Sequence, residues 1–388
     1  MTEEQARVGF SPPDISEEEI AEVVAALRSG WLTTGPRVRE FESEFATFCG
    51  AKHAVGLNSC TAALHLALLG CGIGPGDEVI LPTMTFAATA EVVLAAGATP
   101  VLVDVEADTL CIDPEAVAAA VTEQTRALLP VDYGGQAAEM SSLGALAERH
   151  GLALIDDAAH AVWTTYGGRH VGSLARAACF SFYATKNLTT GEGGMLTTDD
   201  EELAGRVRML SLHGLSRGAW RRYTAQGSWD YDIQRPGWKY NLTDIAAALG
   251  LAQLRRLPRM QERRAALVAL YDRALGSIEE IEFLRDRNRG RHSHHLYVIL
   301  LRLDRLSIDR ARFIEELRTR GIAASVHFKP LHLHSLYVEG GAGRLQPVPV
   351  AEAIYPRLVS LPLSSAHREE DVDRVAQEVK EIVRRHRR

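Results

Sequence analysis

Short apolar stretches alternate with longer amphipathic stretches through the first half of the chain. Each apolar stretch has the length of a buried strand, and most pairs are separated by a stretch of helical periodicity. This alternation predicts a three-layer α/β fold, in which helices cover both faces of a mostly parallel sheet. The sheet is expected to have seven strands, at residues 54–57, 78–81, 100–104, 127–131, 152–155, 177–183 and 194–197.

The first helix carries the clearest boundary signal. Ser16 is followed by three glutamates, which places serine at the N-cap, Glu19 at the capping-box position and negative charge in the first turn. The helix is expected to run to Gly30.

The second half of the chain has a different pattern. Residues 242–275 are expected to form one long helix, or two helices broken near Pro258. Beyond it we expect a strand at 295–303, a helix at 309–320, a strand-like segment at 322–328 and a final helix at 369–385. The sequence therefore predicts a large α/β domain over 1–255 and a smaller C-terminal α+β domain over 256–388.

The composition narrows the class of protein. The 388 residues carry a net charge of -7, which argues against a general nucleic-acid partner. The five cysteines form no C-x-x-C motif, which favours a reducing compartment, so a cytoplasmic location is expected. No apolar run reaches the roughly 18 residues of a membrane span, and the acidic start lacks the apolar core of a signal peptide.

Three groups of residues follow predicted strands and could carry chemistry. The first is residues 58–61 (NSCT), at the start of an Ala/Leu-rich helix. Free N–H groups and hydroxyls at a helix N-terminus bind phosphate, although the same residues also make a plain N-cap. The second is Asp156, Asp157 and His160, directly after the strand at 152–155. A carboxylate there can hold a ring nitrogen protonated, or it can simply cap a helix.

The third group is Lys186, with Ser181 five residues before it and a glycine-rich turn, residues 191–194, after it. Alone, Lys186 reads as a solvated loop lysine. A buried lysine with a lowered pKa is instead a nucleophile for carbonyl groups. A phosphate site, an acid and a lysine at three strand ends together predict pyridoxal 5'-phosphate (PLP), whose chemistry needs all three.

These residues also resemble a known family, the DegT/StrS nucleotide-sugar aminotransferases, which are PLP enzymes of the aspartate aminotransferase fold (fold type I). The resemblance extends over nearly the whole chain, from residue 30 to residue 362. Its motifs occur in the family's order: 30–36 (GWLTTGP), 58–64 (NSCTAAL), 72–79 (GIGPGDEV), 157–160 (DAAH), 181–187 (SFYATKN), 191–194 (GEGG) and 240–245 (YNLTDI).

The resemblance implies a role for each matching residue. Lys186 would form the Schiff base with the cofactor, Asp157 would face the pyridine nitrogen and His160 would lie near the ring's oxygen substituent. The implied phosphate cradle is Ser59, Cys60, Thr61 and Ser181. Phe86 would stack on the ring, although by itself it reads equally well as a core phenylalanine.

The resemblance also implies a homodimer with shared active sites. Asn241 would reach the phosphate of the neighbouring subunit, although by pattern it is the cap of the long helix. On the substrate side, Trp31 and Thr33 of the first motif are implied contacts. His327 and His332, in residues 326–332 (VHFKPLH), either bond sugar hydroxyls or are ordinary loop histidines.

The polar, aromatic-rich stretch 213–240 suits recognition of a nucleotide diphosphate, with Arg217, Arg221 and Arg222 as candidates, or it is a solvated loop between subunits. Residues 292–295 (HSHH) suggest a metal, but no acidic or cysteine partner stands at ligand spacing, so none is predicted.

The resulting hypothesis is a PLP aminotransferase that acts on a dTDP- or UDP-linked 4-keto-6-deoxyhexose with L-glutamate as donor. The segment 229–241 resembles that of family members acting at C4. The alternatives are action at C3 of a keto sugar, action on a cyclitol ketone, and a non-enzymic regulatory protein on the same scaffold. A sugar dehydratase of this fold would carry histidine in place of Lys186.

Overall fold

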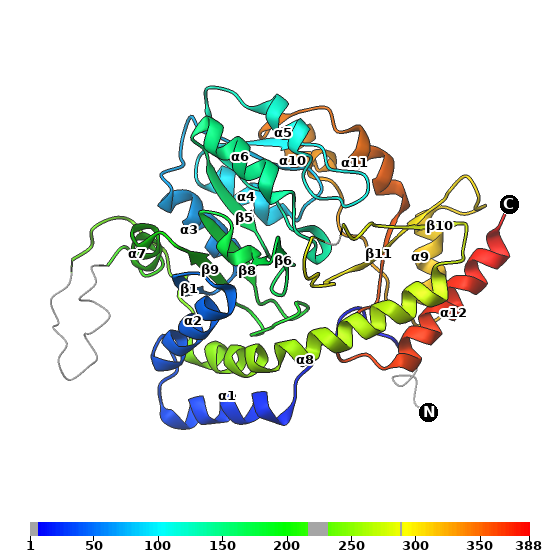
Figure 1. Ribbon diagram of the computed structural model, residues 1–388, viewed down its shortest axis with the longest axis horizontal. Helices are drawn as coiled ribbons and strands as arrows, with labels where there is room; N and C mark the ends of the chain where they lie inside the picture. The colour runs from blue at the N-terminus through cyan, green and yellow to red at the C-terminus, as the bar shows by residue number, and fades with distance from the viewer. Residues whose placement is uncertain (1–6, 216–231, 288) are drawn as a thin grey trace.

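An eight-stranded sheet forms the centre of the computed structural model, which describes residues 7–215, 232–287 and 289–388 (Figure 1). The strand order is β1-β9-β8-β5-β4-β2-β3-β12. The strands are β1 (His53–Leu57), β2 (Glu78–Pro82), β3 (Thr99–Val103), β4 (Thr125–Leu128), β5 (Ala153–Asp157), β8 (Ala177–Ser181), β9 (Gly194–Thr198) and β12 (Arg344–Leu345). Among these strands only β9 runs against its neighbours β1 and β8, so the predicted mostly parallel sheet is confirmed.

The eighth strand is the addition that the sequence did not predict. β12 pairs in parallel with β3 at the edge of the sheet. Gly343, just before it, has a φ of +92°, and a Cβ there would lie 2.5 Å from the carbonyl oxygen of Pro100. A two-residue strand after a glycine-rich loop has no hydrophobic period, so nothing in the pattern marks it.

Alternate residues of the strands point to opposite faces of the sheet, and both faces are covered. In β2, Val79 and Leu81 pack in one core cluster with Leu66, whereas Ile80 packs in another with Leu143. The helices on the first side are α3 (Cys60–Gly70), α4 (Ala87–Ala95) and α7 (Glu201–Leu210), and those on the second include α5 (Pro114–Ala120) and α6 (Met140–His150). The three-layer prediction is therefore confirmed.

The long helix α8 (Asp244–Leu275) is continuous through Pro258. Its first half packs with α2 (Pro36–Cys49) in a cluster that includes Leu254 and Leu257, while its second half places Leu267 and Tyr271 in the core of the C-terminal part. The predicted boundary at 255/256 thus falls inside one helix that belongs to both cores. The division into two domains remains a prediction.

The C-terminal part is built on a three-stranded antiparallel sheet of β10 (Ile281–Phe283), β11 (Tyr297–Leu301) and β13 (Leu358–Leu361). Helices α9 (Arg310–Thr319) and α12 (Glu369–His386) cover it, as predicted, and α10 (Ser335–Val338) and α11 (Pro349–Ile354) are short. The predicted strand at 322–328 was wrong: in this segment only Ile322 and Ser325 form isolated bridges, to Val8 and Ser360. A further pair of two-residue strands, β6 (Thr165–Tyr166) and β7 (Arg169–His170), forms a separate small sheet.

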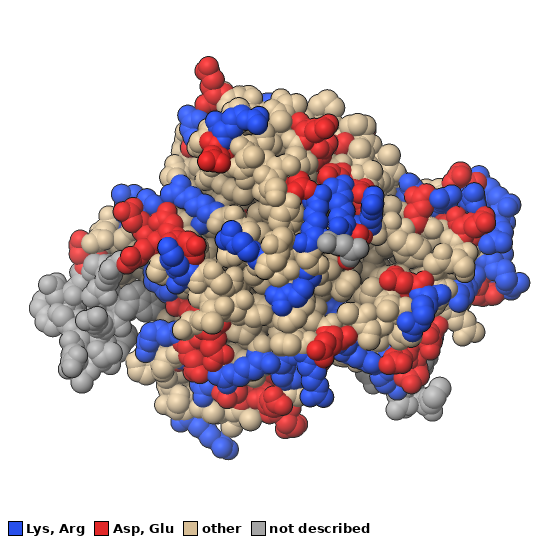
Figure 2. Space-filling model, viewed as in Figure 1, with Lys and Arg blue, Asp and Glu red and all other residues tan. Residues whose placement is uncertain are grey.

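Helix α1 (Glu17–Ser29) lies along α8 on the outside of the molecule (Figure 1). The predicted capping box is present, with Ser16 at the N-cap and Glu19 completing it. On the face shown in Figure 2, acidic and basic side chains are interspersed. The ion pairs of the described residues include Arg255 with Glu40 and Glu44. None of the described helices is long and apolar enough to cross a bilayer.

Candidate active site

A cavity of about 330 Å³ lies at the carboxyl ends of β5 and β8, where parallel sheets bind their ligands. Its walls come from the start of α3, residues 85–89, the ends of β5 and β8, and residues 192–193. The C-terminal part contributes His295, His327 and Phe328. The cavity brings together nine of the residues singled out in the sequence: Ser59, Cys60, Thr61, Phe86, Asp157, His160, Ser181, Lys186 and His327.

Lys186 follows β8 and lies in a turn. Its backbone N–H donates to the carbonyl oxygen of Tyr183 at 2.9 Å. Burial in the cavity lowers the pKa of the Lys186 amine to about 8, while Cys60 and Asp157 act in the opposite direction. A lysine with this pKa is neutral in roughly a tenth of the molecules at pH 7, far more than an ordinary lysine, and the neutral amine is the nucleophilic form.

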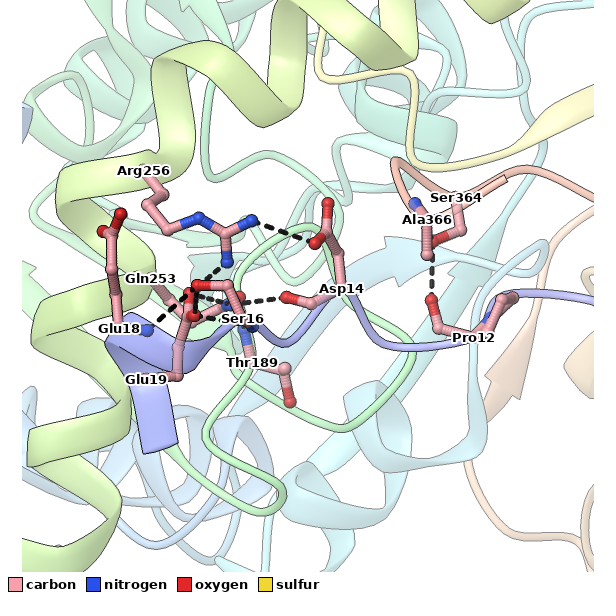
Figure 3. Close-up of polar contacts among 10 residues, drawn as sticks. All are labelled: Pro12, Asp14, Ser16, Glu18, Glu19, Thr189, Gln253, Arg256, Ser364 and Ala366. Atoms are coloured by element: carbon pink, nitrogen blue, oxygen red, sulfur yellow. Dashed lines mark hydrogen bonds and ion pairs between the residues drawn. The ribbon is translucent and has the colours of Figure 1, made fainter. Parts of the chain in front are cut away.

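The loop that follows Lys186 is anchored from behind by α8 (Figure 3). Gln253 accepts the N–H of Thr189 on Oε1 at 3.3 Å, and its Nε2 donates to Asp14 O and Glu19 Oε1, both at 2.8 Å. Glu19 is fully buried and also pairs with Arg256. The amino-terminal segment, α1 and α8 together therefore fix the backbone of the lysine loop.

Asp157 ends β5 and is only 5% exposed. Its carboxylate accepts a hydrogen bond from Thr89 Oγ1 at 2.8 Å and from the N–H of Ala159 at 3.2 Å. Burial raises the pKa of Asp157, and the Thr89 hydrogen bond, the Ala159 N–H and the charge of Lys186 oppose that rise. Two hydrogen-bond donors thus hold the Asp157 carboxylate at the end of β5, and both favour its ionised form.

His160 is held as a neutral hydrogen-bond donor. The N–H of Gly134 donates to His160 Nδ1 at 3.3 Å, so the neutral ring carries its proton on Nε2. Burial lowers the pKa of His160 well below its usual range. The neutral imidazole therefore carries an Nε2–H that it can donate.

The start of α3 fits a phosphate group. The Ser59 hydroxyl caps the helix by accepting the N–H of Ala62 at 3.0 Å, and the first N–H groups of a helix have no acceptors within it. Gly194 passes so close that a Cβ there would lie 2.4 Å from the carbonyl carbon of Ser59. With Thr61 and Ser181 also lining the cavity, these groups fit the phosphate of PLP, while Lys186 and Asp157 fit its aldehyde and ring nitrogen.

Several cavity residues were not predicted. Thr85, Thr89 and Phe10 line the cavity without belonging to any of the motifs. His295, considered in the sequence only as a metal ligand, packs with its ring centroid 4.4 Å from that of His160 and bonds Asn187 Oδ1 through Nδ1 at 3.0 Å. His295 lies beside the cavity because it packs against His160 and bonds Asn187. Both partners are more than 100 residues away in the sequence, so no local pattern predicts this position.

Four predicted residues do not line this cavity. His332 is buried and bonds Thr83 Oγ1 through Nδ1 at 2.7 Å, so it docks its own segment and is assigned no substrate contact. Trp31, Thr33 and Asn241 lie together elsewhere: Trp31 Nε1 donates to the carbonyl oxygen of Thr34 at 3.1 Å, and Asn241 Nδ2 donates to Thr34 Oγ1 at 2.7 Å.

Arg217, Arg221 and Arg222 lie outside the described residues, as does part of the segment 229–241. Within the described ranges, no three His, Cys, Asp or Glu side chains are grouped so that they could hold a metal ion.

Comparison with known proteins gives consistent matches along the chain. The model of the DegT/DnrJ/EryC1/StrS aminotransferase family matches residues 13–380. The spore coat polysaccharide biosynthesis protein SpsC of Bacillus subtilis is 50% identical over 376 residues, which cover 97% of each chain.

Two solved structures extend the comparison. Streptococcus pneumoniae Spr1654, described as a sugar aminotransferase and solved in PMP (pyridoxamine 5'-phosphate), PLP and apo forms, is 38% identical; its PMP form has a TM-score of 0.91 and covers 97% of this chain and 99% of its own. DesI, solved in the presence of its TDP-sugar product, is 32% identical with a TM-score of 0.87, covering 98% of this chain and 94% of its own.

Proposed function

Because the chain belongs to the DegT/DnrJ/EryC1/StrS aminotransferase family, we propose that it aminates C4 of a nucleotide-linked 4-keto-6-deoxyhexose, with dTDP or UDP as the nucleotide and L-glutamate as the amino donor. The broader activity follows from the family: the protein is a PLP-dependent sugar aminotransferase. What is proposed is the position of the ketone, the nucleotide, the donor and the assembly that carries out the reaction.

The observation that carries the assignment is the cavity itself. Lys186, Asp157, His160 and the start of α3 line one cavity, although they come from separate segments of the chain. A regulatory protein on this scaffold would have no need for a lysine of lowered pKa beside a supported buried acid.

Bound PLP supplies an electron sink for the carbon that loses its proton. Lys186 Nζ would carry the proton that this carbon loses and return it in the second half of the transfer. Asp157 would keep the ring nitrogen protonated, and His160 Nε2–H would donate to the ring oxygen. The start of α3 would hold the phosphate and so keep the reacting carbon near Lys186.

The proposed substrate rests on two kinds of support. The segment 229–241 resembles that of members acting at C4, and the relatives include a protein of polysaccharide biosynthesis and a structure with a TDP-sugar product. Within the cavity, His327 reaches the site from the C-terminal part and is the described candidate for bonding a sugar hydroxyl.

A homodimer is part of the proposal. Trp31, Thr33 and Asn241 form one connected surface outside their own cavity, which suits residues that complete the site of a second copy. The described cysteines are all free thiols, which suits a reducing compartment and supports a cytoplasmic location.

The experiment that tests the activity is a panel of dTDP- and UDP-linked 3-keto and 4-keto sugars and a cyclitol ketone, assayed with glutamate and read by product mass. We expect amination of the 4-keto-6-deoxy sugars, and loss of that activity in Lys186→Ala but not in the surface control Lys52→Ala. Preference for 3-keto sugars or for a cyclitol ketone would contradict the C4 assignment, and absence of any transamination would favour a binding protein.

A further inference from the structure

A buried pair of hydroxyl groups lies behind Asp157, and neither belongs to the motifs described above. Thr89 Oγ1 is 2.8 Å from Asp157 Oδ2, and Thr85 Oγ1 is 2.8 Å from Thr89 Oγ1. Both threonines are nearly inaccessible, with 0% and 2% of their surface exposed for Thr89 and Thr85. Thr89 stands in the first turn of α4, and Thr85 lies just before that helix.

The direction of these hydrogen bonds follows from proton counting. An ionised carboxylate only accepts hydrogen bonds, and a hydroxyl has a single proton to donate. Thr89 must therefore give its proton to Asp157, which leaves Thr85 as the donor in the threonine pair. Hydrogen bonds arranged in such a chain polarise and strengthen one another.

Among the side chains around Asp157, Thr89 is the main hydrogen-bond donor to the carboxylate. The N–H of Ala159 reaches the other oxygen at 3.2 Å. Cys60 Sγ lies 3.9 Å from Asp157 Oδ1 but 3.4 Å from the carbonyl oxygen of Cys179, so its one proton is better placed on the carbonyl.

Some charged and titratable neighbours favour the ionised form of Asp157, and others disfavour it. Lys186, after β8, favours the ionised form of Asp157. Asp132 and Asp156, from the segment after β4 and from β5, are buried acids that interact with Asp157. Burial has the largest effect on Asp157: it raises the pKa and so disfavours the ionised carboxylate. A hydrogen-bond donor that points at the carboxylate acts against this effect of burial.

We propose that Thr89 is a positioning residue of the cofactor site, whose hydroxyl orients the Asp157 carboxylate and keeps it ionised, with Thr85 fixing the direction of that hydroxyl. Thr89 acts through Asp157 and needs no contact of its own with the ring. The pairing of Asp157 with the ring nitrogen, and hence the affinity for PLP and its electron-sink strength, depends on this hydrogen bond.

The test compares Thr89→Val, which keeps the shape and removes the hydroxyl, with Thr89→Ser, which keeps the hydroxyl. Three quantities are measured: the dissociation constant of PLP from the apoprotein, the pH titration of the visible absorbance of the bound cofactor, and kcat and KM for glutamate. In Thr89→Val we expect PLP binding to weaken about tenfold or more and kcat to fall by a similar factor, because a hydrogen bond to a charged group is lost. The pH titration is expected to shift, and KM to change little.

The Thr89→Ser variant shows whether the hydroxyl positions Asp157 or the side chain of Thr89 merely fills space. Thr89→Ser should stay within about threefold of the native protein on all three measurements, and Thr85→Val should shift the titration in the same direction as Thr89→Val but less. If Thr89→Val fails to fold, the proposal is still tested by comparing Thr89→Ser and Thr85→Val with the native protein. A native titration in Thr89→Val or in Thr85→Val, or a Thr89→Ser variant as defective as Thr89→Val, would overturn the proposal.

Discussion

Lys186 owes its reactivity to where the fold places it. On the surface it would be a fully charged ammonium group, whereas burial in the cavity lowers its pKa to about 8. The charge of Asp157 and the nearby Cys60 thiol limit that decrease, so the amine can titrate in the physiological range instead of being permanently neutral.

This pKa predicts how the apoprotein takes up its cofactor. Only the neutral amine attacks the aldehyde of PLP, so the attachment rate should rise with pH and level off above about 8. The measurement is the growth of visible absorbance after apoprotein is mixed with PLP across a pH series. A rate that keeps rising to the pKa of an ordinary lysine, about 10.4, would contradict the lowered value.

The residue scale also shows what the sequence can and cannot predict. Lys186, Asp157, His160 and Ser59 were predictable because each stands at a strand end or helix start, which local pattern marks. Thr89 and His295 were not, because one lies within a helix and the other enters from the C-terminal part. His332 shows the opposite limit: its local pattern suits a binding loop, yet it bonds Thr83 in the interior.

At the scale of elements, the lysine loop depends on helices distant in sequence. Gln253 joins Thr189 of that loop to Asp14 and Glu19 of the amino-terminal segment (Figure 3). The capping box was predictable because its two partners, Ser16 and Glu19, are only three residues apart. The use of Glu19 as a buried partner of α8 was not, because it depends on how two helices pack.

Replacing Gln253 with Ala should therefore cost stability. The buried Glu19 carboxylate loses a donor and the Thr189 N–H loses its acceptor, which predicts a decrease of about 1–3 kcal/mol in the free energy of unfolding. Denaturant titration of the apoprotein measures it. Gln377→Ala, on the exposed side of α12, is the matched control and should change stability by less than about 0.5 kcal/mol. Equal effects of the two substitutions would rule out the anchoring role.

At the scale of the whole molecule, the central sheet was predictable from the sequence. The way in which the C-terminal part packs against that sheet and adds β12 to it was not. Strand periodicity marks the seven long strands, and the continuous α8 is one of the two forms expected for residues 242–275. β12 instead depends on pairing with the distant strand β3, which leaves no period in the sequence. The proposed dimer contact is a similar case, because only their motifs suggest such a role for Trp31 and Asn241.

The proposed sharing of active sites between two subunits predicts complementation between two defective variants. Lys186→Ala and Asn241→Ala should each lose activity alone. After the two are unfolded and refolded together, mixed dimers contain one intact site each, so about a quarter of native activity should return. Recovery is measured against each variant refolded by itself. If mixing restores nothing while mixed dimers form, Asn241 acts within its own subunit.

The most direct measurement follows the nitrogen itself. The PLP-loaded protein is incubated with [15N]glutamate and a dTDP- or UDP-linked 4-keto-6-deoxyhexose, and the sugar nucleotide is analysed by mass spectrometry and NMR. The proposed function predicts a sugar that carries the labelled nitrogen at C4. Label at C3, or a sugar that remains unlabelled although glutamate is consumed with another ketone, would contradict it.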